Sequence, residues 1–81
     1  MIFSVHVEVR LREGIADPQG STIERALPSL GFDGVESVRS GKFFQVRVRA
    51  KDEKKAGKQV AQMCARLLAN PVIESYRIEV A

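Results

Sequence analysis

VESVRSGKFFQVRVRA, residues 35–50, is the stretch that decides the predicted fold. From residue 43 onward it alternates apolar and polar side chains, and a period of two is typical of a strand with one buried face. The first half is less regular, because Val35 and Val38 are three residues apart, which suggests either a bulge or that Val35 lies just before the strand. Ser40-Gly41-Lys42 separates the halves. Glycine reaches positive φ without steric cost, so we predict a β-hairpin that turns at Gly41.

Two more strands are predicted at the ends of the chain. Apolar residues occupy every second position from Phe3 to Leu11, which is the cleanest half-buried strand pattern in the sequence. A similar alternation covers Ile73–Val80. That last strand follows Asn70-Pro71, which is expected to stop a preceding helix.

The first helix has two candidate starts. Asp17 is able to accept from the first free amides, with Pro18 preset for the first helical position. Ser21 and Glu24 instead fit a capping box, and Gly20 weakens the earlier start. Both starts leave the same apolar stripe, which consists of Ile23, Ala26, Leu27 and Leu30.

Pro28 interrupts this helix. It removes an amide donor and crowds the carbonyl of Glu24, so we predict a kink or a loosened last turn, with Gly31 closing the helix in a left-handed conformation. The second helix is capped by Asp52. Its predicted buried face consists of Ala56, Val60, Met63, Cys64, Leu67 and Leu68.

The element order is strand, helix, hairpin, helix, strand. Because each helix has a single apolar stripe, both are expected to cover the same sheet face. We therefore predict one α+β domain over residues 1–81, of the ferredoxin-like βαββαβ type, with a four-stranded antiparallel sheet and two helices on one face. The other face stays open, and its expected residues are His6, Glu8, Arg10, Phe43, Gln45, Arg47, Arg49, Arg77 and Glu79.

Composition limits the class of protein. With 81 residues, 44% hydrophobic and 28% charged, the chain is typical of a small globular domain, and a partner is plausible because so small a domain buries a limited core. No apolar run is long enough for a membrane span, and the amino terminus lacks the features of a signal peptide, so we expect a cytoplasmic protein. The single cysteine, Cys64, is expected to be a buried, reduced thiol.

The chemical equipment for catalysis is sparse. There is one histidine, one cysteine and no Gly-rich phosphate loop, so we expect no catalytic activity from the chain alone. His6 is expected to be an exposed sheet residue, and no cluster of ligands suggests a metal. Lysines gather near the start of the second helix, where they form either a solvated face or an anion site: Lys51, Lys54, Lys55 and Lys58.

Two other function classes share the predicted fold. A basic ferredoxin-like sheet is similar to an RNA-recognition motif, but that motif needs aromatic side chains two residues apart on the open face. Phe43 and Phe44 are adjacent, so they point to opposite faces and leave one stacking platform. A small-molecule regulatory domain of the ACT type has the same element order, but we find no ligand motif for it.

Four landmarks in order give a more specific indication. They are Asp17-Pro18-Gln19-Gly20, Leu30-Gly31-Phe32, the Val38–Lys42 segment and the closing Leu67–Glu74 segment. With these landmarks at these spacings, the chain resembles the PurS family nearly end to end. That family provides the small subunit of phosphoribosylformylglycinamidine (FGAM) synthase, which acts in purine biosynthesis. Pro28 departs from the helix expected for the family.

The resemblance implies a structural subunit without catalytic, cofactor-binding or metal-binding residues of its own. ATP and Mg²⁺ would be used by the large synthase subunit PurL, and the glutaminase subunit PurQ would deliver ammonia. The implied partners are a second copy, in a dimer or tetramer, together with PurL and PurQ, but no nucleic acid and no membrane. The candidate interface residues are Asp17, Pro18, Gln19, Gly20, Arg39, Gly41, Lys42, Phe43, Arg47, Asn70 and Pro71.

Overall fold

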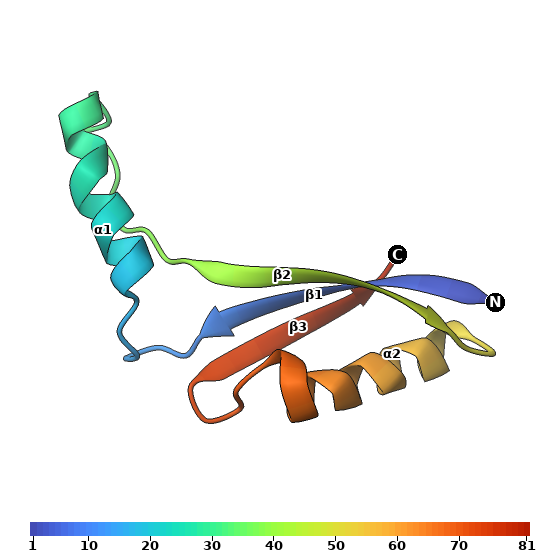
Figure 1. Ribbon diagram of the computed structural model, residues 1–81. Helices are drawn as coiled ribbons and strands as arrows, with labels where there is room; N and C mark the ends of the chain where they lie inside the picture. The colour runs from blue at the N-terminus through green and yellow to red at the C-terminus, as the bar shows by residue number, and fades with distance from the viewer.

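A computed structural model describes residues 1–81, and it has an α+β architecture of three strands and two helices (Figure 1). The strands are β1 (Ile2–Leu11), β2 (Gly41–Arg49) and β3 (Glu74–Val80). The helices are α1 (Pro18–Ala26), continued by a 3₁₀ turn over Leu27–Leu30, and α2 (Glu53–Met63), continued by a π-helical turn over Cys64–Leu68. Neither helix has the length and apolar character needed to cross a membrane.

The three strands form one antiparallel sheet in the order β2-β1-β3. In the register of the central strand, Val5 lies between Val46 and Val80, and Val7 lies between Phe44 and Ile78. Cross-strand partners point to the same face, so one sheet face is apolar and the other polar, as the alternation predicts. The period-two prediction for β1 and β3 is confirmed.

Helix α2 covers the apolar face and forms the core with it. The side chains of Val5, Val7 and Val9 are fully or almost fully buried under Val60 and Cys64 of the helical segment. Helix α2 lies mainly over β1 and β3 and reaches β2 less. As a result, alternate β2 residues on this face are only half-buried, namely Phe44, Val46 and Val48.

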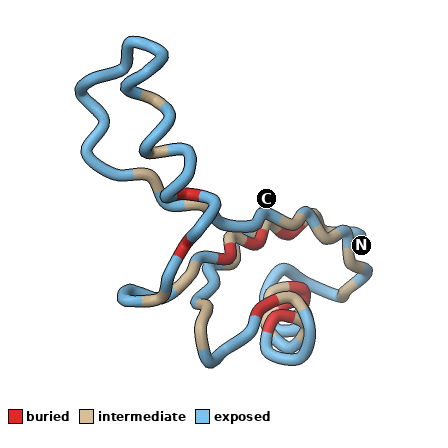
Figure 2. Tube along the Cα trace, turned by 60° about the vertical axis from the view of Figure 1, so that its left-hand side comes forward, coloured by how far each residue is buried: buried red, intermediate tan, exposed pale blue.

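Helix α1 does not join this core. It projects from one end of the sheet with the segment that returns to β2, and we call residues 12–40 the arm (Figure 1). Figure 2 shows most of the buried residues in the sheet and α2, whereas the arm is mainly exposed and has buried residues only at its base. The expectation that both helices cover one sheet face is therefore wrong. The radius of gyration, 16.1 Å, is well above the roughly 12 Å of a compact chain of this length.

The predicted hairpin of residues 35–50 is also wrong in its first half. Residues 35–40 form no strand, and β2 begins at Gly41 and pairs directly with β1, so the sheet has three strands where we expected four. Gly41 is needed for a close approach and not for a turn, because a Cβ there would lie 2.6 Å from the Val9 carbonyl oxygen. Because residues 35–40 form no strand, neither a bulge there nor a strand that starts just after Val35 is present.

The start of α1 follows the first of its two predicted signals. Asp17 is the N-cap, with Pro18 in the first helical position, so the capping box at Ser21 is not used. Pro28 does interrupt the helix, because the α-helix ends at Ala26, but the last turn tightens to 3₁₀ where we expected a kink or a loosened turn. Gly31 closes that turn with φ 97°, in the left-handed conformation we predicted.

The second helix matches its predicted cap and most of its predicted face. Asp52 accepts from the amide of Lys55 at 2.8 Å, and the thiol of Cys64 is buried as expected. Leu67 is the exception, with 83% of its surface exposed. The π-helical turn, closed by the amide of Ala69 on the carbonyl of Cys64, widens the helix and rotates Leu67 away from the sheet.

Candidate functional site

The base of the arm is held by one carboxylate. Oδ1 of Asp17 accepts from the Gly20 amide at 3.0 Å and from the Ser40 hydroxyl at 2.6 Å. Its Oδ2 accepts from the Ser40 amide, also at 2.6 Å. The two hydrogen bonds from Ser40, helped by the one from Gly20, lower the pKa of Asp17 to about 2. Asp17 therefore ties the entry of the arm to its exit and stays ionised at neutral pH.

Further contacts hold the two sides of the arm together. The carboxylate of Glu24 accepts from the Val38 amide at 2.8 Å. Gly20 packs so closely against the returning segment that a Cβ would lie 2.7 Å from the Val38 carbonyl oxygen. The Arg39 guanidinium donates to two carbonyls before the helix, those of Arg12 and Ile15, at 3.5 and 3.4 Å. These contacts are polar, so the arm holds its shape without a core.

The arm presents large apolar side chains to solvent. Ile23, Leu30 and Phe32 are 41%, 70% and 57% exposed. Ile23 and Leu30 belong to the stripe that we expected to pack on the sheet. Because that stripe has no partner within the chain, the arm carries an unused apolar surface.

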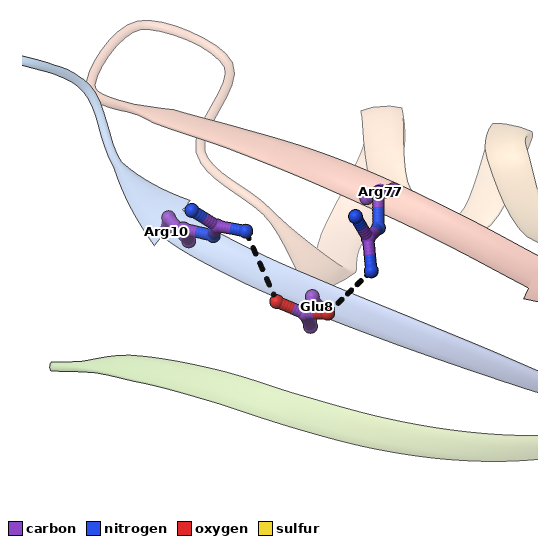
Figure 3. Close-up of polar contacts among 3 residues, drawn as sticks. All are labelled: Glu8, Arg10 and Arg77. Carbon is purple, nitrogen blue, oxygen red and sulfur yellow. Dashed lines mark hydrogen bonds and ion pairs between the residues drawn. The ribbon is translucent and has the colours of Figure 1, made fainter.

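The open sheet face carries an ion network centred on Glu8 (Figure 3). One carboxylate oxygen lies 3.2 Å from the Arg77 guanidinium on β3, and the other lies 3.4 Å from that of Arg10 on β1. All three side chains are substantially exposed. Such exposed pairs contribute little stability, so the network mainly sets the charge and shape of this face.

Phe43 is an exposed aromatic side chain on the open face, and it belongs to the edge strand β2. It is 60% exposed, and its ring lies 5.4 Å from that of His6, with the two planes inclined at 60°. Gln45 donates to the Ser4 hydroxyl at 2.9 Å. Beside Phe43, where the end of β1 meets the start of β2, the surface is hollowed into an open groove of about 650 Å³. The face thus combines an exposed aromatic, ion pairs and a groove.

The predicted interface residues lie in four neighbouring parts of the molecule. Asp17, Pro18, Gln19, Gly20 and Arg39 lie at the arm base, where Asp17 and Gly20 are buried. Phe43 and Arg47 point from the open face, whereas Gly41 and Lys42 begin β2, and Lys42 pairs with Glu74 at 3.3 Å. Asn70 and Pro71 form the loop between α2 and β3.

That loop has its own hydrogen bonds. The side chain of Asn70 accepts from the Val72 amide at 3.1 Å, and the carbonyl of Pro71 accepts from the Arg12 guanidinium at 3.2 and 3.1 Å. The Asn70 amide donates to the carboxylate of Glu74, which lowers the pKa of that group. Arg12 and Glu74 connect this loop to the arm base and to the start of β2. The groove beside Phe43 is lined by Arg39, Gly41 and Lys42 as well, so it connects the arm base to the open face.

The sequence-based prediction missed the partners at the arm base. Ser40 was assigned to a turn and Glu24 to a capping box, yet both bind across the arm. It also placed the apolar stripe of α1 in the core. The signal available was Pro28, near the end of that helix, together with the irregular segment after it, which fits poorly with a strand.

The only histidine and the only cysteine lie on opposite sides of the sheet. His6 is on the open face, whereas Cys64 is buried under α2, and its burial raises the pKa of the thiol. A nucleophile and its base must lie within hydrogen-bonding reach. These two side chains are therefore unable to act as a pair.

Comparison with known proteins gives a consistent result. A family model described as PurS, phosphoribosylformylglycinamidine (FGAM) synthase, matches residues 4–81. The phosphoribosylformylglycinamidine synthase subunit PurS of Archaeoglobus fulgidus is 44% identical over 78 residues, covering 96% of this chain and 95% of that protein. The subunit of the same name from Bacillus subtilis is 42% identical over 79 residues, covering 98% and 93%.

A solved structure extends the likeness to the arm. A chain in the structure of PurLQS from Thermotoga maritima superposes with a TM-score of 0.92 at 34% identity, covering 100% of this chain and 99% of that one. A superposition of that quality over the whole length includes residues 12–40. The projecting arm is therefore a feature of that chain as well.

Proposed function

The chain belongs to the PurS family, and from that premise we propose that it is the non-catalytic small subunit of phosphoribosylformylglycinamidine synthase. In this role it joins the large subunit PurL, which uses ATP and Mg²⁺, to the glutaminase PurQ, which releases ammonia from glutamine. The complex converts formylglycinamide ribonucleotide to its amidine in purine biosynthesis. The small subunit contributes contact surfaces and no reacting group.

The observation that carries this proposal is the amount of surface left exposed. The chain has 6144 Å² of accessible surface, whereas a compact monomer of its mass, 9.0 kDa, has about 4,900 Å². The excess exceeds the roughly 800 Å² that each partner contributes to a standard protein interface. A chain with this shape is suited to binding other chains.

We propose that the first partner is a second copy. The arm of one copy supplies an apolar stripe, and the half-covered β2 side of the other copy's sheet leaves room for it. Exchange of the arms would place two helices on each sheet, as in a ferredoxin-like fold. In the ferredoxin-like fold a fourth strand pairs with the edge that β2 leaves free here. In the assembly, the second copy would cover this edge.

The predicted contact residues remain part of this proposal. We assign Pro18, Gln19 and Arg39, together with the buried Asp17 and Gly20, to the arm that meets the second copy. We assign Phe43 and Arg47 on the open face, together with the loop of Asn70 and Pro71, to contacts with the larger subunits. Gly41 and Lys42 lie between these two regions and border the groove.

Reconstitution from separate subunits tests the proposed function. The chain alone should neither hydrolyse ATP nor release ammonia from glutamine. Added to purified PurL and PurQ, it should form a ternary complex and restore glutamine-dependent synthesis, measured by product formation and by the mass of the complex. Full glutamine-dependent synthesis from PurL and PurQ without this chain would contradict the proposal, as would turnover by the chain alone that survives further purification.

A further inference from the structure

The chain has two positively charged surfaces, and they differ in chemistry. The lysine surface consists of Lys51, Lys54, Lys55 and Lys58 and surrounds the start of α2. The arginine surface is the open sheet face, which carries no lysine. Its register places four arginines on that face: Arg10, Arg47, Arg49 and Arg77.

The arginine surface is only partly neutralised. Glu8 binds Arg10 and Arg77, whereas Arg47 and Arg49 form no ion pair within the chain. Glu79, the remaining carboxylate on this face, lies opposite His6 in the register. Four arginines against two glutamates give this face a net charge of +2. The two unpaired arginines lie on the edge strand β2.

We propose that the open sheet face binds an acidic surface of one of the larger synthase subunits and does not bind a second copy. This inference rests on the proposed function, since it assigns one face of the subunit to a partner of that complex. The partner should present carboxylates opposite Arg47 and Arg49. It should also cover the exposed ring of Phe43.

The chemistry of arginine supports an acidic partner. A guanidinium binds a carboxylate through two parallel hydrogen bonds, and it gives up water more readily than an ammonium group does. Interface cores are enriched in arginine and aromatic residues and depleted of lysine, which is the composition of this face and not that of the lysine surface. Phe43, exposed beside a groove, supplies an apolar anchor of the kind that dominates binding energies.

Charge also argues against a second copy as the occupant. A two-fold interface brings the same patch of both copies together, so each unpaired arginine would face a surface of the same net sign. The second copy already has an apolar surface to bind, which is the arm. The two kinds of contact therefore use different surfaces, and one subunit is able to make both at once.

A matched pair of charge-reversal variants tests the proposal. R47E/R49E reverses two charges on the open face, and K54E/K55E reverses two charges on the lysine surface, so the net charge of both variants is the same. Each is mixed with PurL and PurQ, and complex formation is followed by light scattering and titration at low and physiological salt. We expect R47E/R49E to weaken binding at least tenfold and K54E/K55E to change it less than threefold. Sedimentation should show the same self-association for both.

Folding of each variant is checked by circular dichroism. If R47E/R49E does not fold, R47Q/R49Q replaces it in the binding measurement. This neutral pair should weaken binding less than the reversed pair and reduce its salt dependence. Equal loss of binding in the lysine and arginine variants would overturn the proposal, because it would indicate a general charge effect. Unchanged binding of R47E/R49E, with a normal wild-type complex, would overturn it and leave the proposed function standing. If the wild type forms no complex, the proposed function itself fails.

Two further outcomes would assign the face to another partner. Loss of self-association in R47E/R49E would make the open face a contact between copies. Submicromolar binding of single-stranded RNA by the wild type near physiological salt, abolished in R47E/R49E, would make it a nucleic-acid surface. Either result would overturn the proposal. With one exposed aromatic on the face, we expect only weak, strongly salt-dependent RNA binding.

Discussion

The body of the subunit and its arm are stabilised in different ways. The body, made of β1, β2, β3 and α2, is held by apolar side chains, and its central strand has three valines with almost no exposure. The arm has two buried residues, Asp17 and Gly20, and its contacts across the base are hydrogen bonds to ionised side chains. The body buries apolar side chains of its own, whereas the arm keeps its shape by polar contacts and leaves large apolar side chains exposed.

The largest expected effect is on the body. Val7→Asp places a carboxylate between Phe44 and Ile78 under α2, where no cation is available. An unpaired buried charge costs at least about 4 kcal/mol, which is comparable to the whole stability of a domain this small. We expect loss of the folded state in circular dichroism and denaturant titration. Ser4→Asp, on the open face of the same strand, is the control and should fold. A cooperative unfolding transition of near-normal stability in Val7→Asp would contradict the conclusion that buried apolar side chains stabilise the body.

The matching change in the arm should have a different result. Leu30→Asp adds a carboxylate where 70% of the side chain is already exposed, so the chain should keep its helical signal. Self-association, measured by sedimentation across a concentration series, should weaken at least tenfold, because an apolar contact is replaced by a charge. Ser29→Asp, in the same 3₁₀ turn, should have a smaller effect. Normal self-association of Leu30→Asp would show that the arm does not carry the contact between copies.

A third change tests the polar stabilisation of the arm base. Asp17→Asn keeps the size of the side chain but replaces an acceptor oxygen with an amide that meets the donors of Ser40. At pH 7 we expect the melting temperature to fall by about 4–8 °C, which is typical of a lost helix cap in a small domain. Ser40→Ala removes one of the two hydrogen bonds from Ser40 and should have a smaller effect.

The same carboxylate predicts a pH dependence. The folded state lowers the pKa of Asp17 from 3.8 to about 2, so ionised Asp17 stabilises the fold. That contribution is complete above the unfolded pKa and is lost as the pH falls through 3.8 towards 2. The difference in melting temperature between wild type and Asp17→Asn should therefore be constant near neutral pH and shrink as the pH falls to 2. A difference that stays constant down to that pH would show that Asp17 acts through packing alone.

The smallest expected effect is at Pro28. A proline inside an α-helix costs up to about 3 kcal/mol, but the α-helix here ends at Ala26, before the proline. Pro28→Ala therefore restores no α-helical hydrogen bond. It also gives the unfolded chain more conformational freedom, which favours unfolding. We expect stability to drop by about 0.4–1 kcal/mol in denaturant titration. A gain of more than about 1 kcal/mol would indicate that alanine lets α1 continue through Gly31.

The sequence predicted the body well and the arm poorly, for a physical reason. The period of two assigned the faces of β1, β2 and β3 correctly, because a strand has no other way to place successive side chains. The residues of the open face follow directly from that alternation. The length and cap of α2 follow from local signals too, although the π-helical turn that exposes Leu67 depends on tertiary packing.

The arm depends on contacts between distant residues, which local patterns do not describe. Asp17 and Ser40 are 23 positions apart, and no periodicity relates them. Gly41 has two possible uses, a turn or a close approach, and the choice depends on which strand lies beside it. A helix with one apolar stripe indicates that something covers it, but not whether the covering surface belongs to the same molecule.

Cys64 makes the chain convenient for spectroscopic labelling. It is the only cysteine, its thiol is fully buried, and the burial raises its pKa, so it should react slowly with maleimide or nitroxide reagents. A second cysteine at an exposed position such as Ser29 would then be the preferred point of attachment. One dye or spin label on each arm would report the distance between the arms of two copies in solution, with no need to replace the native thiol.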